Sequence, residues 1–384
     1  MNKEIAAMFS LIKSALTGQK LLLNSNINWD KIIKIAKLHQ IVPIIFYGLK
    51  NSNIATPYDD KLFEITTQNI FIEQRQFNII EEVKNAFKKN NIDFLILKGA
   101  RLKNIYPKSE MRVMGDIDIL IRPEQYFEVR QIMLQMNFKE GLEWNYECHW
   151  RKNDINIELH KQFYSSNEYH IYDFFDNIWQ KVKTQKNNKN SFEMSKEDEY
   201  IYIFLHLLKH YCAGGIGLRQ FIDIYTYRLK FNRLDERYIE NTLKESGFLD
   251  FHNNVIETLN YWFDGGVENQ TVRTITQKAI VSCLFGTEES RDMLTVTRAI
   301  KNAGNVKKAK MKELNTMLFP SLSKMRSQYT VLTKVPFLLP VIWILRLVKV
   351  VFKPKNIKNN IKHLKKFDAK KVAEFDAGLK KVGL

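Results

Sequence analysis

The stretch LKGARLKNIYPKSEMRVMGDIDILI, which occupies residues 97–121, decides the fold of this 384-residue chain. Just before it, residues 92–97 form a mostly apolar run that stops at Lys98 and a glycine. This pattern is typical of a buried strand that leads into a turn and a helix start. At the end of the stretch, residues 117–121 form a second apolar run directly after Asp116. Two short strands around a glycine turn predict the start of a small α/β sheet.

The sheet is expected to continue downstream. Pro123 opens a predicted helix to about Asn137, because proline is tolerated in the first helical turn. Residues 144–150 and 155–163 alternate between apolar and polar side chains around the polar residues 152–154, which predicts a hairpin. The order strand, helix, strand, helix, hairpin predicts a mixed α/β sheet.

Helical periodicity marks both flanks of this sheet. Trp29, Ile32 and Ala36 recur at helical spacing, and the polar stretch 181–190 is interpreted as a loop or linker before further helices. We predict an α/β (α+β) fold, a small mixed sheet flanked by N-terminal and C-terminal helical regions. The expected regions are helical for 1–90, the α/β core for 91–180, helical for 191–300, and basic and partly apolar for 301–384.

Three carboxylates are the strongest candidates for chemistry. Side chains alternate between the faces of a strand, so Asp116 and Asp118 share one face, as do Glu158 and His160. If these strands are neighbours, the three acids converge and repel one another unless a cation neutralises them. Mg²⁺ or Mn²⁺ suits such oxygen ligands, and two ions can clamp an in-line phosphoryl displacement. The alternative is that the D-x-D pair marks a solvated strand edge.

These motifs together resemble a known family. Residues 97–121, followed by INIELHKQF at 155–163, are similar to the polymerase-β-like nucleotidyltransferase superfamily. More closely, they resemble an uncharacterised bacterial branch with LKG, Tyr-Pro, an Arg before GDIDxL, and ELH. HLLKH at 206–210 and GLRQFIDIY at 217–225 resemble its helical half, and the resemblance covers about residues 1–266.

The resemblance implies an activity and roles for the acids. Asp116 and Asp118 would bind the metal ions that hold the triphosphate of an NTP such as ATP, and Glu158 would complete the metal site near the acceptor hydroxyl. The reaction would move a nucleoside monophosphate to an acceptor hydroxyl or phosphate. The branch is often associated with surface-polysaccharide biosynthesis, which suggests a sugar-linked or lipid-linked acceptor.

The phosphate-binding turn departs from the family pattern. The family reads Gly-Ser, whereas this chain has Gly99-Ala100, so backbone amides remain available to an anion but the hydroxyl is lost. Lys98 or Arg101 is expected to supply the missing phosphate contact. The loss favours a rival hypothesis, in which a catalytically inactive protein of this fold acts as a membrane-associated binding partner. The three acids oppose the rival, because clustered acids cost stability unless a cation binds.

Two further residues are candidates for phosphate contacts. Arg112 lies four residues before Asp116 in an expected loop, where it would bind phosphate or form a surface salt bridge. His160 shares the face of Glu158 and would bond phosphate, orient Glu158, or sit at the sheet edge.

Other histidines and a charged pair carry weaker signals. His206 and His210 share a helix face, and packing beside the site is preferred over a metal pair. Arg219 and Asp223 are four apart and are expected to form a local ion pair, with a role in the site as the alternative. His149 is assigned no role.

The positive charge is concentrated at one end. The chain carries a net charge of +17, and residues 301–384 hold 20 Lys or Arg against four acids, or +16. The first 300 residues are therefore close to neutral, and no specific nucleic-acid partner is expected for the main body. Three cysteines without a CxxC pair indicate a reducing compartment, and no signal peptide is expected.

The C-terminal part contains an apolar run, VPFLLPVIWIL at residues 335–345. Eleven residues are too few to span a bilayer, but lysines flank the run and suggest contact of 331–371 with an anionic membrane surface. The alternatives are a core helix with a solvated tail, or an acidic partner. The expected location is cytoplasmic, peripheral at the inner face of the membrane if that contact forms.

Overall fold

The fold was analysed in a computed structural model. It describes residues 1–23, 27–143, 146–163, 174–175, 177–186, 188–212, 216–282, 315, 318–320, 322, 325, 332, 335–352 and 377–384. Most of the predicted membrane-contact stretch 331–371, and much of 283–334, lies outside these residues.

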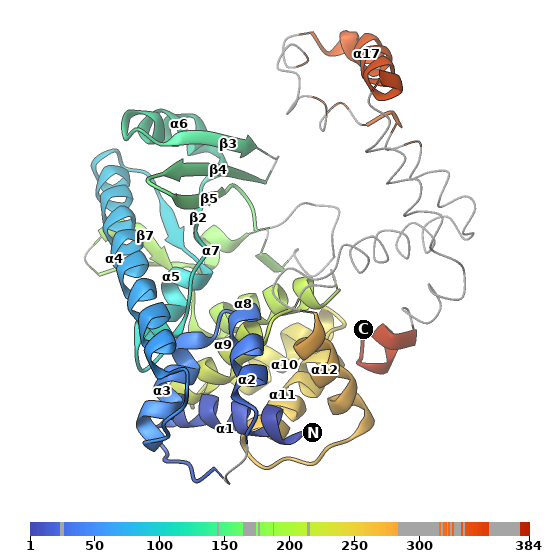
Figure 1. Ribbon diagram of the computed structural model, residues 1–384. Coiled ribbons are helices and arrows are strands. Elements are labelled where there is room, and N and C mark those ends of the chain that lie inside the picture. The colour runs from blue at the N-terminus through green and yellow to red at the C-terminus, as the bar shows by residue number, and fades with distance from the viewer. Residues whose placement is uncertain are drawn as a thin grey trace.

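A seven-stranded mixed sheet forms the α/β part of the protein (Figure 1), as predicted. Its spatial order is β3-β4-β5-β2-β1-β7-β6, with β2 parallel to β5 and antiparallel to β1. The strands are β1 (Phe94–Ile96), β2 (Asp116–Ile121), β3 (Lys139–Glu143), β4 (Glu147–Lys152), β5 (Ile155–His160), β6 (Lys183–Gln185) and β7 (Asn188–Glu193).

The predicted hairpin is formed by β4 and β5. Asn153 and Asp154 between them both have positive φ, 49° and 63°, as a two-residue turn that matches the strand twist requires. Asn and Asp tolerate this left-handed conformation better than most side chains. The local sequence therefore sets the register of β4 against β5.

The interpretation of 181–190 as a loop or linker is wrong. Residues 183–185 and 188–193 form β6 and β7, and β7 extends the sheet by pairing in parallel with β1. β6 is the edge strand and β7 is its neighbour, and both contain few apolar side chains, so their polar composition hides them. The sheet therefore continues beyond residue 180, the predicted limit of the α/β core.

The two faces of the sheet pack against different helices. Ile117 and Ile157 point into a cluster formed with the 31-residue helix α4 (Asp59–Lys89) and with α6 (Tyr126–Gln135). Leu120, on the opposite face of β2, belongs to the larger core of the helical body. Asp118 shares that second face and lies beside this core.

The helical body combines both flanks of the chain. Helices from the first 90 residues and from the region after the sheet share one hydrophobic cluster and gather below the sheet in Figure 1. They are α1 (Lys3–Thr17), α2 (Trp29–Leu38), α3 (Val42–Ser52), α8 (Lys196–Cys212), α9 (Leu218–Lys230), α10 (Glu236–Glu245), α11 (Leu249–Phe263) and α12 (Gln270–Val281). The short α5 (Lys98–Leu102) follows β1, and α7 (Ile178–Lys181) precedes β6.

The described C-terminal residues fall into two groups. The apolar run forms a short 3-10 turn, Pro336–Leu338, and α17 (Leu339–Phe352), in a small cluster with Met325 and Leu332. Val382 is fully buried in the core of the helical body, and its carbonyl accepts a hydrogen bond from Asn254 of α11. Within the described ranges, every helix is too short or too polar to cross a membrane.

Candidate active site

The register of two parallel strands brings the predicted acids together. Asp118 on β2 is the direct partner of Glu158 on β5, and Asp116 is the partner of Asn156. The intervening Ile117 points to the opposite, apolar face, because side chains alternate along a strand. The sequence-based prediction required these two strands to be neighbours, and the structure shows that they are.

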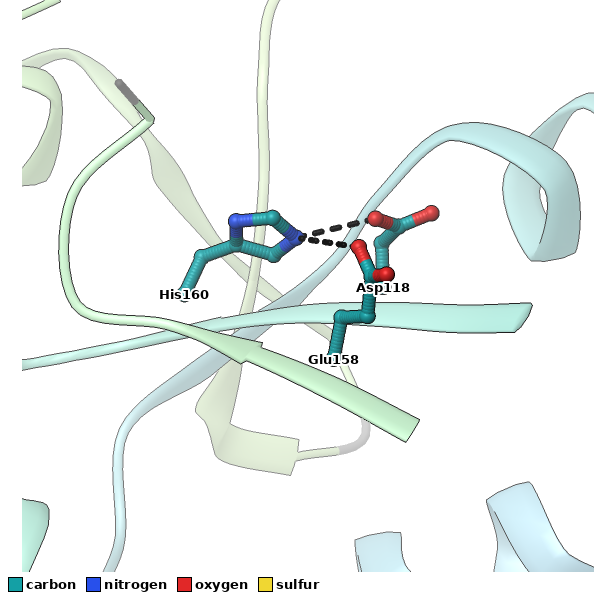
Figure 2. A group of neighbouring side chains, drawn as sticks. All are labelled: Asp118, Glu158 and His160. Atoms are coloured by element: carbon teal, nitrogen blue, oxygen red, sulfur yellow. Dashed lines mark hydrogen bonds and ion pairs between the residues drawn. The ribbon is translucent and has the colours of Figure 1, made fainter. Parts of the chain in front are cut away.

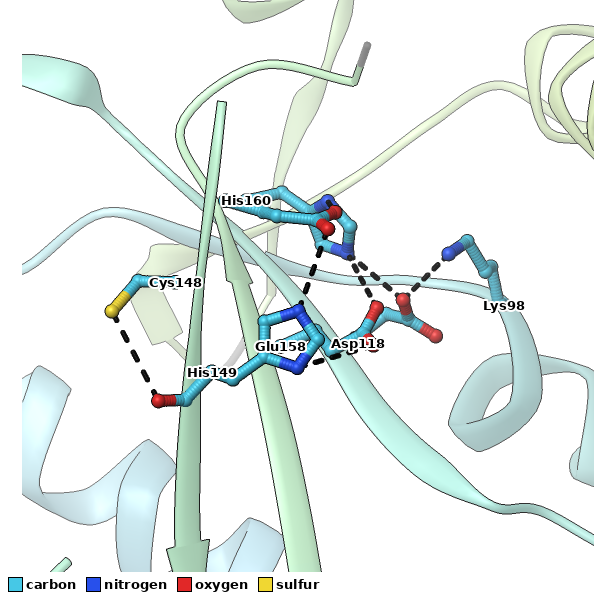
Figure 3. A network of polar contacts seen from close by, with 7 residues as sticks. Lys98, Asp118, Cys148, His149, Glu158 and His160 are labelled. Atoms are coloured by element: carbon cyan, nitrogen blue, oxygen red, sulfur yellow. Dashed lines mark hydrogen bonds and ion pairs between the residues drawn. The ribbon is translucent and has the colours of Figure 1, made fainter. Parts of the chain in front are cut away.

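Asp118 is the buried centre of the site. Its side chain is 3% exposed, and its Oδ1 accepts hydrogen bonds from Lys98 Nζ at 2.6 Å and His160 Nε2 at 2.9 Å. Burial would raise the pKa of Asp118, but the Lys98 ammonium and His160 outweigh burial and hold that pKa well below its usual range. Asp118 is therefore an anion held between two nitrogen donors, His160 (Figure 2) and Lys98 (Figure 3).

Glu158 has the opposite electrostatic character. Burial, followed by the charges of Asp118 and Asp116, raises the pKa of Glu158 to about 9. Its Oε2 lies 3.7 Å from His160 Nε2, so the same imidazole nitrogen faces both acids (Figure 2). Two neighbouring acids with diverging pKa values indicate that, without added positive charge, the site holds only one of them ionised.

The turn after β1 delivers Lys98 to the acids. Lys98 has a φ of 42°, in the left-handed region that a lysine rarely adopts. A Cβ on Gly99 would lie 2.8 Å from Met114 Cγ, so a larger residue here would force the Met114 side chain to shift. Ala100 is buried in the cluster that contains Met114 and Ile117. The alanine that replaces the family's serine thus packs in the core.

Both predicted arginines are paired with carboxylates. Arg101 Nε donates to Glu199 Oε1 at 3.0 Å. Arg112 is buried and donates two hydrogen bonds to Asp223, at 3.0 and 2.9 Å. Tyr106 donates to the same carboxylate at 2.6 Å. The sequence left a surface salt bridge and a phosphate contact open for Arg112. The structure shows an ion pair, but this pair is buried and not at the surface.

The expected local ion pair between Arg219 and Asp223 is wrong. Asp223 is bound by Arg112, 111 positions earlier in the chain, because that arginine reaches it with two aligned donors. Arg219 instead donates to the carbonyl of Val113 at 2.9 Å and to Gln40 Oε1 at 2.7 Å. Burial and the neighbouring Arg112 lower the pKa of Arg219 to about 10.

The two histidines of α8 lie near the site. The rings of His206 and His210 are 4.5 Å apart and edge to face. Burial, then His210 and the Lys98 ammonium, hold the pKa of His206 well below its usual range. His206 is therefore a neutral imidazole close enough to Lys98 to be affected by its charge. It is absent from the groups of side chains, among the described residues, that could hold a metal ion.

Sequence reasoning missed two residues on β4. Glu147 and His149 lie opposite His160 and Glu158, respectively, in the antiparallel register. The alternation of β4 contained the signal, because Cys148 and Trp150 are buried on the other face. His149, to which the sequence analysis gave no role, borders the candidate site.

The donor set fits a divalent cation. One ligand atom each from Asp118, Glu158 and His160 lies within 4.8 Å of the others, and carboxylate oxygens are ligands that suit Mg²⁺ and Mn²⁺. Asp116, two residues from Asp118 on the same face, adds a carboxylate that is close enough to raise the pKa of Glu158. These residues can hold a cation if the ion pair between Lys98 and Asp118 breaks and the Lys98 ammonium moves away.

Comparison with known protein families gives the class of this protein. A family model described as an uncharacterised nucleotidyltransferase matches residues 25–264, and the chain belongs to that family. Two solved structures of the antibiotic-resistance factor ANT(2'')-Ia are similar to this chain at 15% identity. The solution structure gives a TM-score of 0.35 and covers 45% of this chain and 91% of that one. The crystal structure of ANT(2'')-Ia in complex with adenylyl-2''-tobramycin gives a TM-score of 0.32 and covers 44% of this chain and 96% of that one. No curated protein matches.

Proposed function

We propose that this nucleotidyltransferase is metal-dependent and moves a nucleoside monophosphate from an NTP to an acceptor hydroxyl or phosphate. The observation that carries the proposal is the pairing of Asp118 with Glu158 on adjacent strands. At neutral pH the two acids do not both ionise without added positive charge, as the pKa of about 9 for Glu158 indicates. A divalent cation supplies that charge and, when bound, stabilises the charge that develops in phosphoryl transfer.

We assign the acids to different sides of the reaction. Asp116 and Asp118 would hold Mg²⁺ or Mn²⁺ on the donor side, together with the triphosphate. Glu158 would complete the cation site and, when ionised, accept the proton of the acceptor hydroxyl. The acceptor oxygen then bonds to the α-phosphorus, the bond to pyrophosphate breaks, and pyrophosphate leaves. His160 would orient Asp118 through its Nε2 hydrogen bond.

Among the predicted phosphate contacts, we favour Lys98. Its ammonium is already at the acids, and a cation that displaces it from Asp118 would free it for phosphate. The amides of Gly99 and Ala100 stay predicted contacts. Arg101 and Arg112 would first have to leave their carboxylate partners.

The acceptor and the location are also proposals. We propose a sugar-linked or lipid-linked acceptor reached at an anionic membrane surface. Apolar side chains exposed on and just before α17 support the surface contact, since Phe337 is 80% and Ile344 is 62% exposed. Basic residues crowd the sequence around this run.

The function is tested with labelled NTPs, cell extract as the acceptor source, and Mg²⁺ or Mn²⁺. Transfer of label with release of pyrophosphate, lost in Asp118→Asn, supports the proposal. If all four NTPs and both metals give no transfer and no binding, the rival hypothesis of an inactive binding partner replaces it.

A further inference from the structure

A row of metal-binding side chains continues across the sheet beyond the site described above. In the antiparallel register of β4 and β5, His149 is the direct partner of Glu158, just as Asp118 is on the other side. Glu147 is the direct partner of His160. Glu158 therefore lies in the middle of a three-strand row, with Asp118 on one flank and His149 on the other (Figure 3).

The distances join these side chains into one group. His149 Nδ1 lies 3.7 Å from Glu158 Oε1, and His149 Nε2 lies 3.4 Å from Glu147 Oε1. One ligand atom each from Glu147, His149 and Glu158 lies within 4.8 Å of the other two. All three side chains are partly exposed, at 16%, 32% and 18%, so an ion can reach them.

A second observation points to an absent ligand at the same place. His160 is 3% exposed, and its Nδ1 has no hydrogen-bond partner among the described residues. This nitrogen lies 3.6 Å from Glu147 Oε2, beyond hydrogen-bond distance. Buried polar atoms are nearly always paired, so an unpaired nitrogen directed at a carboxylate marks a position where another group is expected.

We propose that Glu147, His149 and Glu158 form a second cation site, which shares Glu158 with the site at Asp118. An imidazole ligand favours borderline transition metals, so this second site would take Zn²⁺, Co²⁺ or Mn²⁺ in preference to Mg²⁺. Each site has one imidazole, His160 at the first and His149 at the second. The first site has three acids, Asp116, Asp118 and Glu158, against two at the second, so the first is more selective for Mg²⁺ and the two sites differ in selectivity. The inference rests on the proposed function only through the shared Glu158.

The test uses the full-length protein saturated with Mg²⁺, to which Co²⁺ is added as a spectroscopic probe. One equivalent of Co²⁺ should bind and give a visible absorption band from oxygen and nitrogen ligands. Cys148 points to the other face of β4, so no thiolate-to-cobalt charge-transfer band is expected. His149→Ala and Glu147→Gln should each weaken Co²⁺ binding at least tenfold, with unchanged Mg²⁺ binding.

Two matched variants separate the outcomes. Glu140→Gln removes an acid from a different group, formed with Glu143 and Cys148, and should leave Co²⁺ binding unchanged. Asp118→Asn should lose nucleotidyl transfer and keep the Co²⁺ site. If Co²⁺ binds through His149 although the wild type transfers no nucleotide, the proposed function fails and this site stands. Absence of Co²⁺ binding, or binding that is unchanged in His149→Ala, overturns the second site.

Discussion

The ammonium of Lys98 lies 2.6 Å from Asp118 Oδ1 and forms the ion pair at the centre of the acidic site. Burial alone would lower the pKa of Lys98, but the charge of Asp118 outweighs it, and that pKa is raised well above its usual range. In the metal-free protein, Lys98 therefore supplies the positive charge that a metal ion would otherwise supply. A metal ion that binds Asp118 must therefore compete with the Lys98 ammonium, which is part of the same chain.

The first prediction follows from this competition. Asp118→Asn should abolish transfer and also destabilise the protein by about 3 kcal/mol, because removing one partner strands a buried charge. The loss should stay near the lower end of the usual range, because Lys98 is 18% exposed. Urea unfolding and pyrophosphate release measure the two effects.

The matched control is the double variant Lys98→Met with Asp118→Asn. It removes both charges and should recover most of the lost stability without recovering activity. If Asp118→Asn turns over like the wild type, the assignment of Asp118 is wrong. If the double variant stays as unstable as the single one, the stability effect has another origin.

The second prediction concerns pH. Glu158 has a pKa of about 9 in the folded protein, against an ordinary value of 4.5. Between these values the folded state holds a proton that the unfolded state has lost, so stability falls as pH rises through this window. A cation competes with the same proton, so Mn²⁺ affinity should rise by up to about tenfold per pH unit until about pH 9.

Melting temperatures from pH 5 to 10, with and without Mn²⁺, check this pH dependence. The metal should raise the melting temperature, more so together with an NTP, and its effect should grow with pH. Glu158→Gln has no proton to lose and should flatten the metal-free profile. A wild-type profile that matches this variant over the whole range would contradict the raised pKa.

The third prediction separates the donor and acceptor sides. Glu158→Gln should reduce turnover at least about 100-fold, in the range for loss of a general base, while NTP binding weakens much less. Rapid-mix turnover and equilibrium binding of a non-hydrolysable NTP give the two values. Equal losses in both would move Glu158 to the donor side.

The fourth prediction concerns Arg112 and Asp223. Their buried ion pair, with two hydrogen bonds, joins α9 to the loop before β2. Asp223→Leu should therefore lower the free energy of unfolding by about 3–5 kcal/mol, because it leaves the buried Arg112 unpaired. The double variant Arg112→Met with Asp223→Leu should recover much of that loss. If it also recovers the wild-type KM for NTP, Arg112 is structural. A KM that stays raised while stability recovers assigns Arg112 to phosphate.

The fifth prediction concerns the membrane surface. Ile344→Glu in the full-length protein should reduce pelleting with anionic vesicles at least about tenfold, because it places a charge in the apolar contact. Phe127→Glu is the matched control, since Phe127 is 77% exposed on α6, which is more than 170 residues before the basic region in the sequence. High salt should release the wild type only in part, because salt screens lysines but not apolar burial. Equal pelleting of both variants would refute the contact through α17.

Truncation is the weaker experiment for that question. Val382 and the last residues pack on α11, and a Cβ on Gly383 would lie 2.8 Å from the backbone nitrogen of Phe251. Removal of the C-terminal part would therefore expose the core of the helical body as well as delete α17.

The sequence by itself determined the local features of the site. The alternation of Asp116, Ile117 and Asp118 separates the acids from the core, and the same alternation holds for β5. The turn at Asn153 and Asp154 sets the hairpin register. Each of these features depends on residues within a few positions of one another, so a pattern reveals it.

Only the tertiary structure decided which distant segments meet. The parallel pairing of β2 with β5 puts Asp118 beside Glu158, and the pairing of β7 with β1 adds strands whose polar composition concealed them. Asp223 pairs with Arg112, although Arg219 is much closer to Asp223 in the sequence. Strand pairing and buried ion pairs depend on the packing of the whole chain, because the free energy of such contacts comes from burial and alignment that no local pattern encodes.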